Sequence, residues 1–312
     1  MKVYNEFVGD DNGVFVRCLI NHDKAPNVIF LMTPIGSVEY GVAIQNYQPL
    51  FDNGFNVFAV DLPGIGNSSN ARFTYNNIKA AMKSVAEYIK ENYSDSIHLY
   101  GGTGTGGIIG QALASDKDLP YFQSYSQLGV ANHGNLAMIG NSTLLKLVFP
   151  IMKIAAKFFP KYRLKFKIPK YNGYNAEKEN NWYRNMMKEY PGIFDFPLEV
   201  VYTLLWLLIA KDSPINEQPC SPTLVMAAKH DRYYETEYVN AYYQKLETDK
   251  KLIWLDDSHC VFVWRAPELA QLVMDWINST ESKENKDRNN ADLFQSPANT
   301  QKDGGKEVLP FF

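Results

Sequence analysis

The chain has 312 residues and a formal net charge of −3 at pH 7, from 31 basic and 34 acidic side chains. Hydrophobic residues make up 46% and charged residues 21%, as in globular proteins that bury a core without disulfide or metal staples. The absence of a basic excess argues against a dedicated nucleic-acid-binding protein. The three cysteines stand at no metal-like spacing, so we expect no disulfide framework, no metal site and no cofactor.

No targeting or membrane-spanning pattern stands out in the chain. Acidic residues precede any apolar run at the N-terminus, so we expect no secretory signal. The most apolar stretch, 200–210, is about half as long as the roughly 20 residues that cross a bilayer. We therefore expect a reduced, cytoplasmic protein.

Apolar strand patterns alternate with helical patterns along the first part of the chain. Continuous apolar runs predict strands at Val14–Ile20, 27–32, Asn56–Val60 and 96–100. Helical periodicity predicts helices at 44–51, at Tyr75–Asn92 and from about Ile108. The pattern resumes with strands at 223–228 and 251–255 and a closing helix at 267–277. Strands that are apolar on both faces, each followed by a helix, predict an α/β fold with a mostly parallel sheet covered by helices.

Two segments depart from this alternation. Residues 135–218 carry aromatic and aliphatic helical patterns, including 144–159 and 200–210, and we interpret them as a helical cap inserted between two parts of the core, 1–134 and 219–278. Extra core helices are the plainer alternative. Residues 279–312 are polar, so we expect them to form a disordered tail.

A dense run of glycines follows the strand at 96–100. Its sequence, Gly101-Gly102-Thr103-Gly104-Thr105-Gly106-Gly107, indicates a very tight turn and close backbone contacts. One interpretation is a phosphate-binding loop, but the run does not lie in the first strand–helix unit and no Gly-Lys-Ser/Thr follows. The other is a nucleophile elbow, G-x-nucleophile-x-G, which places a side chain on a strained turn between strand and helix.

The order of motifs along the chain resembles the α/β-hydrolase fold superfamily, over roughly residues 14–278. A Pro-Gly loop at 33–36 follows the second predicted strand, and DLPGIGNS at 61–68 resembles the D-x-P-G-x-G-x-S loop of that superfamily. After the elbow come Lys229-His230-Asp231 and Asp257-Ser258-His259, at the places of the acid and the histidine. The resemblance implies an esterase-, lipase- or acyl-hydrolase-like protein, with Asp231 orienting the catalytic base His259.

The usual elbow serine is absent, and two registers compete for its position. Aligned on the following helix, with Gly106-Gly107 and then the small Gly110, the nucleophile position is Gly104, and more positions match in this register. Aligned on the strand, the position is Thr103, whose hydroxyl His259 would activate. The resemblance places the oxyanion donors at the N–H groups of Ile35 and of the residue after the nucleophile, Gly104 or Thr105.

The two registers imply different chemistry. With Thr103, an acyl group passes to the threonine and then to water. With Gly104, His259 acts as a base on water or on a bound substrate, or the pocket only binds a ligand. The aromatic and aliphatic insert predicts an apolar acyl or alkyl ester or thioester as substrate. The alternative is an inactive hydrolase scaffold that serves as a ligand-binding or interaction module.

Other side chains near these motifs have simpler interpretations. Cys260 beside His259 is more typical of a buried, inert thiol than of a nucleophile. We expect His98 to be a hydrogen-bonded core residue, His230 to be structural, and Asp61 to satisfy backbone groups of its loop. We expect Asp231 to lie at or near a helix N-cap.

The segment 161–170 carries five cations and no acid. A solvated surface is the plainer interpretation. Peripheral contact with anionic lipid headgroups is the alternative.

Overall fold

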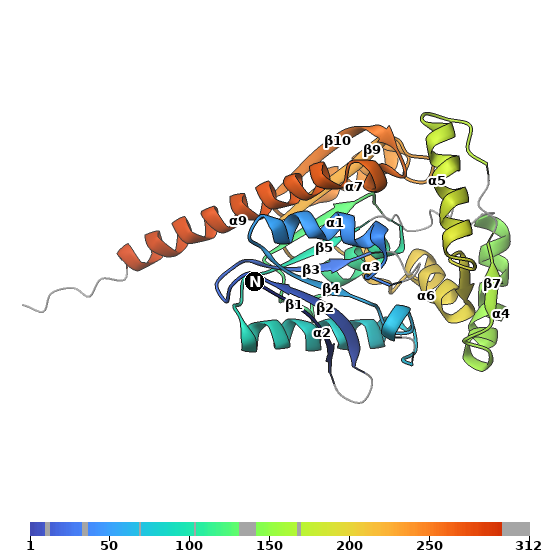
Figure 1. Cartoon of the computed structure of the whole chain (residues 1–312), viewed down its shortest axis with the longest axis horizontal. Coiled ribbons are helices and arrows are strands. Elements are labelled where there is room, and N and C mark those ends of the chain that lie inside the picture. The colour runs from blue at the N-terminus through green and yellow to red at the C-terminus, as the bar shows by residue number, and fades with distance from the viewer. Residues whose placement is uncertain are drawn as a thin grey trace, which may run out of the picture.

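A computed structural model of the chain describes residues 1–9, 13–32, 37–68, 70–102, 104–130, 142–166 and 170–294. Its centre is an eight-stranded sheet in the order β1-β2-β4-β3-β5-β6-β9-β10 (Figure 1). The strands are β1 (Lys2–Val8), β2 (Val14–Ile20), β3 (Asn27–Leu31), β4 (Asn56–Val60), β5 (Ile97–Gly101), β6 (Ser124–Leu128), β9 (Thr223–His230) and β10 (Lys250–Ser258). All neighbours from β4 to β10 are parallel, whereas β2 is antiparallel to both β1 and β4.

Helices cover both faces of this sheet, as the sequence predicts. One face carries α2 (Tyr75–Asn92) and α3 (Thr105–Ala114), and the other carries α1 (Gly41–Asp52), α8 (Val261–Trp264) and α9 (Ala266–Phe294). Side chains of β3 alternate between the two faces of the sheet. Ile29 and Leu31 belong to the core on the side of α2 and α3, and Val28 and Phe30 belong to the core on the side of α1, α8 and α9. A further helix, α7 (Thr236–Lys245), packs beside β9. The α/β-hydrolase fold expected from the motifs is confirmed.

The sequence did not predict β1 or β6. β1 is an edge strand whose side chains are mostly exposed, so it has no apolar run. β6, Ser-Tyr-Ser-Gln-Leu, is buried on every residue although three of its five side chains are polar. Two of those polar groups have hydrogen-bond partners: Ser124 bonds to His98, and Gln127 bonds to Gly129 and Tyr242. A strand in the sheet interior can be polar when neighbouring strands satisfy its side chains.

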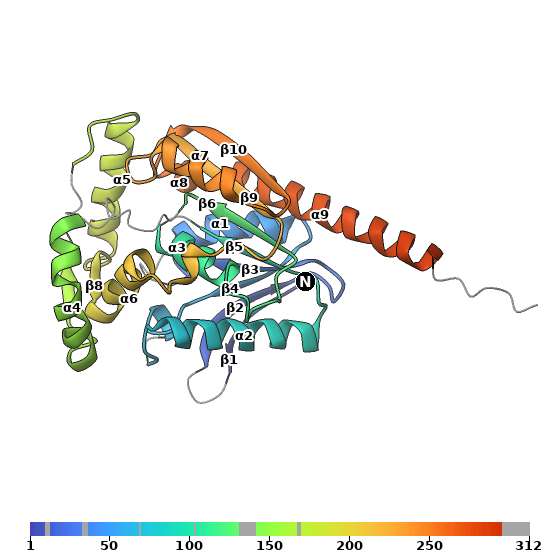
Figure 2. The same ribbon diagram turned by 180° about the vertical axis from the view of Figure 1, so that it is seen from behind.

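Between β6 and β9 the chain leaves the sheet and forms a layer of its own, which we call the insert (142–216). It contains α4 (Ser142–Phe158), α5 (Ala176–Glu189), α6 (Leu198–Ile209), the short 3₁₀ helix η2 (Pro214–Asn216) and a two-stranded ribbon of β7 (Arg163–Lys165) and β8 (Asp195–Pro197). Figure 2 shows α6 next to the core and α4 at the outer edge of the molecule. Within the described ranges, no helix combines the length and the apolar character needed to cross a membrane.

The closing helix is much longer than the sequence indicates. α9 continues to Phe294 and so includes residues 279–294 of the segment for which the sequence predicts a disordered tail, and residues 295–312 lie outside the described part of the chain. The extension has anchors: Thr280 is buried, and Lys283 pairs with Asp249 at 2.7 Å. The polar composition of this segment predicts disorder. Composition does not record these contacts, because they connect residues that are far apart in the sequence.

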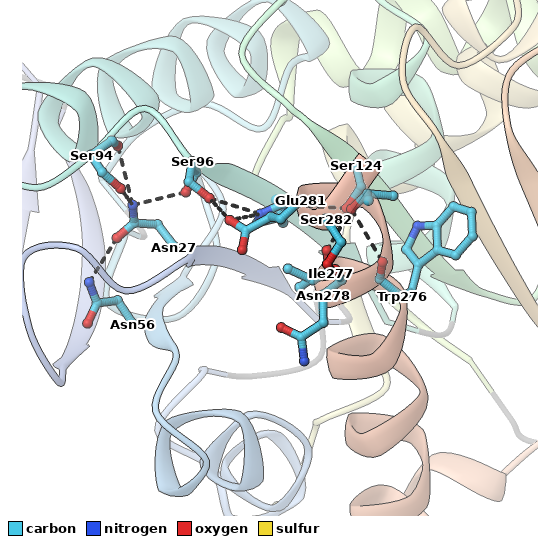
Figure 3. Close-up of polar contacts among 12 residues, drawn as sticks. Asn27, Asn56, Ser94, Ser96, Ser124, Trp276, Ile277, Asn278, Glu281 and Ser282 are labelled. Carbon is cyan, nitrogen blue, oxygen red and sulfur yellow. Dashed lines mark hydrogen bonds and ion pairs between the residues drawn. The ribbon is translucent and has the colours of Figure 1, made fainter. Parts of the chain in front are cut away.

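A partly buried polar cluster ties α9 to the amino-terminal ends of the sheet strands (Figure 3). The ring of His98 lies between Ser124 Oγ, 2.8 Å from Nδ1, and Ser96 Oγ, 3.1 Å from Nε2. Glu281 of α9 forms a hydrogen bond with Ser96 and lies 3.6 Å from His98 Nε2. His98 is therefore a hydrogen-bonded core residue, as the sequence predicts, and it lies at the opposite end of the strands from the elbow.

We predict that Glu281→Gln lowers stability near neutral pH by about 1 kcal/mol, a value reduced for partial exposure. His98 and Ser96 hold the pKa of Glu281 below its ordinary value against the opposing effect of burial. A depressed folded-state pKa stabilises the fold above the unfolded pKa, and this stability is lost as the pH falls through the folded pKa. Thermal unfolding of the parent protein and of Glu281→Gln, measured from neutral to acid pH, should show that their difference in stability disappears in acid. Glu247→Gln, at an exposed position, is the control; a difference for Glu281→Gln that persists in acid contradicts the pairing.

Candidate functional site

The predicted site residues gather at the carboxyl ends of neighbouring parallel strands. The glycine turn follows β5, Asp231 follows β9, and His259 follows β10. β5, β6, β9 and β10 are consecutive in the sheet, so their carboxyl ends share one edge. Open α/β sheets bind ligands at this edge, near the point where the strand order reverses.

Gly104 occupies the turn between β5 and α3. Its backbone has φ 64° and ψ −127°, and it is the N-cap residue of α3. Residues that carry a side chain rarely adopt this backbone conformation without strain. A strained turn between strand and helix is the geometry of a nucleophile elbow. Thr103, the other predicted nucleophile position, and Ile35 lie outside the described residues.

Close backbone packing explains the glycines that follow the turn. A Cβ on Gly106 would lie 2.6 Å from the carbonyl carbon and oxygen of Met32, and one on Gly107 would lie 2.6 Å from the oxygen of Gly102. A Cβ on Gly102 would meet the oxygen of Leu31 at 3.1 Å. The start of α3 thus packs directly against the end of β3. Gly102 and Gly106 flank Gly104 with the spacing of the elbow motif.

Asp231 and His259 form a buried pair. Asp231 Oδ2 lies 2.8 Å from His259 Nδ1, and the side chains are only 6% and 7% exposed. The other carboxylate oxygen accepts the backbone N–H groups of Tyr233 at 2.7 Å and Tyr234 at 3.1 Å. Asp231 therefore caps the turn before α7 rather than α7 itself, whose N-cap is Glu235. A carboxylate at Nδ1 leaves Nε2 as the proton acceptor, and no described residue forms a hydrogen bond with Nε2.

Two tyrosines link this pair to the elbow. Tyr234 Oη donates to the carbonyl of Gly104 at 3.5 Å, and its ring lies 5.8 Å from the ring of His259. Gly129, at the end of β6 with φ 79°, makes room for it, because a Cβ there would lie 2.5 Å from the Tyr234 ring. Tyr233 packs edge-on against His259 at 4.6 Å. Burial raises the pKa of Tyr233 to about 12, so this ring stays neutral beside the base.

The insert holds the loop that carries Asp231. Glu179 of α5 is fully buried and pairs with Arg232 at 3.1 Å. The guanidinium of Arg232 also lies 4.7–5.2 Å from the ring centroids of three tyrosines: Tyr171, Tyr183 and Tyr233. A buried charge needs such partners. The sequence analysis missed this contact, because the partners come from the insert and from a loop after β9.

The histidine loop has its own support from the insert. Asn175, in the left-handed conformation with φ 58°, donates from Nδ2 to Asp257 Oδ1 at 3.0 Å. Asp257 also accepts from Trp264 Nε1 at 2.8 Å and from the N–H of Ser258 at 2.8 Å. These bonds fix the backbone immediately before His259. No sequence motif marked Asn175 or Asp257 for this role.

The remaining residues singled out in the sequence have structural roles. Cys260 is fully buried, and burial raises the pKa of its thiol well above the ordinary value, which leaves it unreactive. His230 is partly exposed and lies 3.2 Å from Asp256. Asp61 accepts hydrogen bonds from Ser37 Oγ, Val38 N and Asn67 N at 2.7–2.9 Å. It thereby joins its loop to the segment that precedes α1, as expected for a residue that satisfies backbone groups.

The elbow offers a hydrogen-bond donor for a developing negative charge. The N–H of Thr105 lies in the first turn of α3, where a helix supplies no acceptor of its own. Helix N-termini favour negative charge. Among the described residues, no group of three His, Cys, Asp or Glu side chains is arranged to hold a metal ion.

A separate cavity of about 380 Å³ lies between the insert and the start of α2. Its walls include Phe73, Tyr202 and Trp206, with Arg72 and Glu199 paired beside them. Neither Asp231 nor His259 lines it. This cavity is therefore distinct from the edge of the sheet where the His–Asp pair lies.

Comparison with known proteins agrees with this geometry. The family model Hydrolase_4, described as serine aminopeptidase, S33, matches residues 37–261, which is most of the chain. The chain belongs to the Hydrolase_4 family. The matched region of this Hydrolase_4 member includes the elbow, Asp231 and His259. A search of the curated proteins found no match.

Solved structures share the fold of this Hydrolase_4 member at low identity. The α/β hydrolase GrgF from Penicillium sp. sh18 is 13% identical with a TM-score of 0.68, over 90% of this chain and 99% of that one. A thermostable carboxyl esterase from Bacillus coagulans is 13% identical with a TM-score of 0.65, over the same shares. A soluble variant of monoglyceride lipase from Saccharomyces cerevisiae is 15% identical with a TM-score of 0.62, over 90% and 95%. At this identity the likeness establishes the fold.

We predict that Gly106→Ala destabilises the Hydrolase_4 fold by about 2 kcal/mol or more, as overpacking does when backbone blocks the added methyl. The added Cβ meets the main chain of Met32 at 2.6 Å, so neither side can move without shifting a core strand. Urea unfolding measures the change. Gly41→Ala is the matched control, because a Cβ there has nothing within 4 Å. Equal stability of the two variants contradicts the proposed contact.

Proposed function

We propose that this protein hydrolyses carboxylic esters, with His259 as general base and Asp231 as the residue that orients it. The observation that carries the proposal is the buried contact of 2.8 Å between His259 Nδ1 and Asp231 Oδ2 beside the elbow. A scaffold that only bound a ligand would have no need for a buried imidazole that a carboxylate orients. Burial of both groups also strengthens their interaction.

The group that attacks the ester is water in this proposal. The backbone conformation of Gly104 supports the register in which this residue occupies the nucleophile position, and glycine has no side chain to acylate. His259 Nε2 takes a proton from water as the water oxygen attacks the carbonyl carbon. The tetrahedral oxyanion collapses, the C–O bond to the alcohol breaks, and the imidazolium returns its proton to the leaving oxygen. An acid and an alcohol result.

The other register keeps a covalent mechanism. There the hydroxyl of Thr103 loses its proton to His259, attacks the carbonyl and forms an acyl-enzyme that water then hydrolyses. In both registers we assign the N–H of the residue after the nucleophile position, Gly104 or Thr105, and that of Ile35 as oxyanion donors. The two mechanisms differ in whether a stable acyl adduct forms, which makes them separable by experiment.

For the substrate we propose an ester or thioester with an apolar acyl or alkyl group. The insert acts as a cap in this proposal, because its helix α5 contacts the loop of Asp231 and carries the aromatic residues Trp182 and Tyr183. Aromatic and aliphatic linings favour apolar ligands. Among the similar folds are a carboxyl esterase and a monoglyceride lipase, which is consistent with this class.

A second function rests on Gly104 itself. Loss of a covalent nucleophile typically costs several orders of magnitude in rate, so the same site can serve as a ligand-binding module without turnover. The two functions predict different consequences of removing the base. Loss of His259 abolishes turnover in a hydrolase and leaves a binding module with no activity to lose.

We predict that His259→Ala lowers the hydrolysis of short and medium p-nitrophenyl acyl esters by about 10²- to 10⁴-fold, the usual contribution of a positioned base. The measurement is kcat/KM with purified protein and a matched uncatalysed blank. His22→Ala, at an exposed loop position, should retain full activity. Turnover of the parent protein that does not exceed the His259→Ala background would rule out hydrolysis of these esters in favour of binding.

We also predict that Gly104→Ser creates a reactive serine that a fluorophosphonate labels, at a cost of about 1–3 kcal/mol for a side chain with positive φ. Intact-mass spectrometry should detect one adduct on Gly104→Ser, no adduct on the parent protein, and none on Gly104→Ser combined with His259→Ala. Thr103→Ala should leave ester hydrolysis unchanged. A labelled parent protein that loses its label in Thr103→Ala would instead identify Thr103 as the nucleophile.

A further inference from the structure

An exposed apolar surface covers the outer side of helix α4. Seven of the thirteen large hydrophobic residues that are exposed in the described part of the chain lie within 144–162. Leu147 is 70% exposed, Ile151 67%, Ile154 62% and Phe158 67%. Their spacing of four, three and four residues places them on one side of the helix. We call these four residues the outer face of α4.

The outer face is not the side by which α4 packs on the protein. Leu145, Phe149 and Met152 pack against the hydrophobic core, and Phe149 stacks on Tyr202 of α6 at 5.4 Å. α4 is thus apolar on two opposite sides, and only the inner one is used. Figures 1 and 2 both place α4 at the periphery of the molecule, with α6 between it and the core. Monomeric proteins rarely expose an apolar surface of this extent without a partner.

The charged residues that α4 and the segment after it contribute are all positive, although Lys153 and Lys157 also line the cavity that contains Glu199. Residues 142–170 carry eight lysines and arginines and no acid, whereas the whole chain has a net charge of −3. Lys146, Lys153 and Lys157 are exposed and follow one another at seven and four residues, so they form a stripe along one border of the outer face. Lys161, Arg163 and Lys165 continue the positive charge just beyond α4, and Phe159 and Tyr162 continue the apolar surface.

We propose that the outer face of α4 docks on the surface of an anionic lipid bilayer. An interfacial helix buries its apolar side at the boundary between headgroups and acyl chains, while flanking lysines contact anionic headgroups. The outer face supplies the apolar side and the lysine stripe supplies the charge. Charge complementarity selects anionic lipid over a neutral surface. The site differs from the segment 161–170 marked in the sequence, because the apolar contact is made by α4 and that segment only adds cations.

This docking does not depend on ester hydrolysis. It uses residues that are exposed and remote in sequence from Asp231 and His259, so a protein that fails as a hydrolase can still bind lipid. The test therefore measures binding alone. Co-sedimentation of the full chain with vesicles of phosphatidylcholine and with vesicles that also contain phosphatidylglycerol separates the apolar and the electrostatic contributions.

Two sets of substitutions test the proposal. Leu147→Ser, Ile151→Ser and Ile154→Ser together should weaken binding to anionic vesicles by about 1,000-fold, since each buried aliphatic side chain contributes about tenfold or more. Lys146→Gln, Lys153→Gln and Lys157→Gln together should weaken it by about 100-fold, at about fivefold per cation. High salt should abolish the second effect and leave part of the first.

Matched controls separate docking from general changes of surface. Met187→Ser with Tyr238→Ser removes exposed apolar side chains elsewhere, and Lys24→Gln, Lys90→Gln and Lys211→Gln remove exposed cations elsewhere. Both control sets should bind vesicles like the parent protein. Thermal unfolding checks that every variant is folded, which the exposure of the substituted residues favours.

Three results would overturn the proposal. One is absence of binding of the parent protein to anionic vesicles at low salt. Another is that the variant with the three outer-face substitutions, or the variant with the three lysine substitutions, binds anionic vesicles as well as its control variant does. The last is concentration-dependent dimerisation in analytical ultracentrifugation that disappears in the outer-face set, which would assign this surface to a second copy of the chain.

Discussion

The first turn of α3 lies in backbone contact with the end of β3, and no side chain fits between them. A Cβ on Gly106 would approach the carbonyl of Met32 to 2.6 Å, and one on Gly107 would approach that of Gly102 equally closely. The chain must therefore reverse from strand to helix within very few residues, which places Gly104 at positive φ. The other features of the site are arranged around this turn, because Tyr234 bonds to the carbonyl of Gly104 and packs beside His259.

The His259–Asp231 pair does not need an alcohol at the turn in order to form. Asp231 is held by the N–H groups of Tyr233 and Tyr234, and His259 follows a backbone that Asp257 fixes. The insert adds two more restraints, through Glu179 on Arg232 and Asn175 on Asp257. The base is thus oriented by contacts that are independent of the residue at position 104. This independence is consistent with the proposed attack by water, in which the turn supplies no nucleophilic side chain.

The insert has two separate apolar surfaces with different environments. On its inner side, Phe149 and Met152 of α4 pack against the core. On its outer side, Leu147 and Ile151 are about two-thirds exposed beside a row of lysines. A helix that is apolar on two opposite sides, as α4 is, has a second apolar surface that its packing on the core does not use. The same segment therefore links the His–Asp site, through α5, with a surface suited to lipid, through α4.

The sequence by itself determined the fold class, the order of the strands with continuous apolar runs, and the positions of Asp231 and His259. These follow from local patterns, because a run of apolar residues indicates a buried strand and a motif of neighbouring residues indicates a turn. Only the tertiary structure decided that Gly104 has positive φ, that the polar strand β6 lies inside the sheet, and that α9 continues past Ile277. Each of these depends on a partner that is distant in sequence. The turn packs against Met32. His98 contacts Ser124 of β6 and Glu281 of α9. A backbone angle or a satisfied polar group is set by such neighbours, and composition or periodicity does not record them.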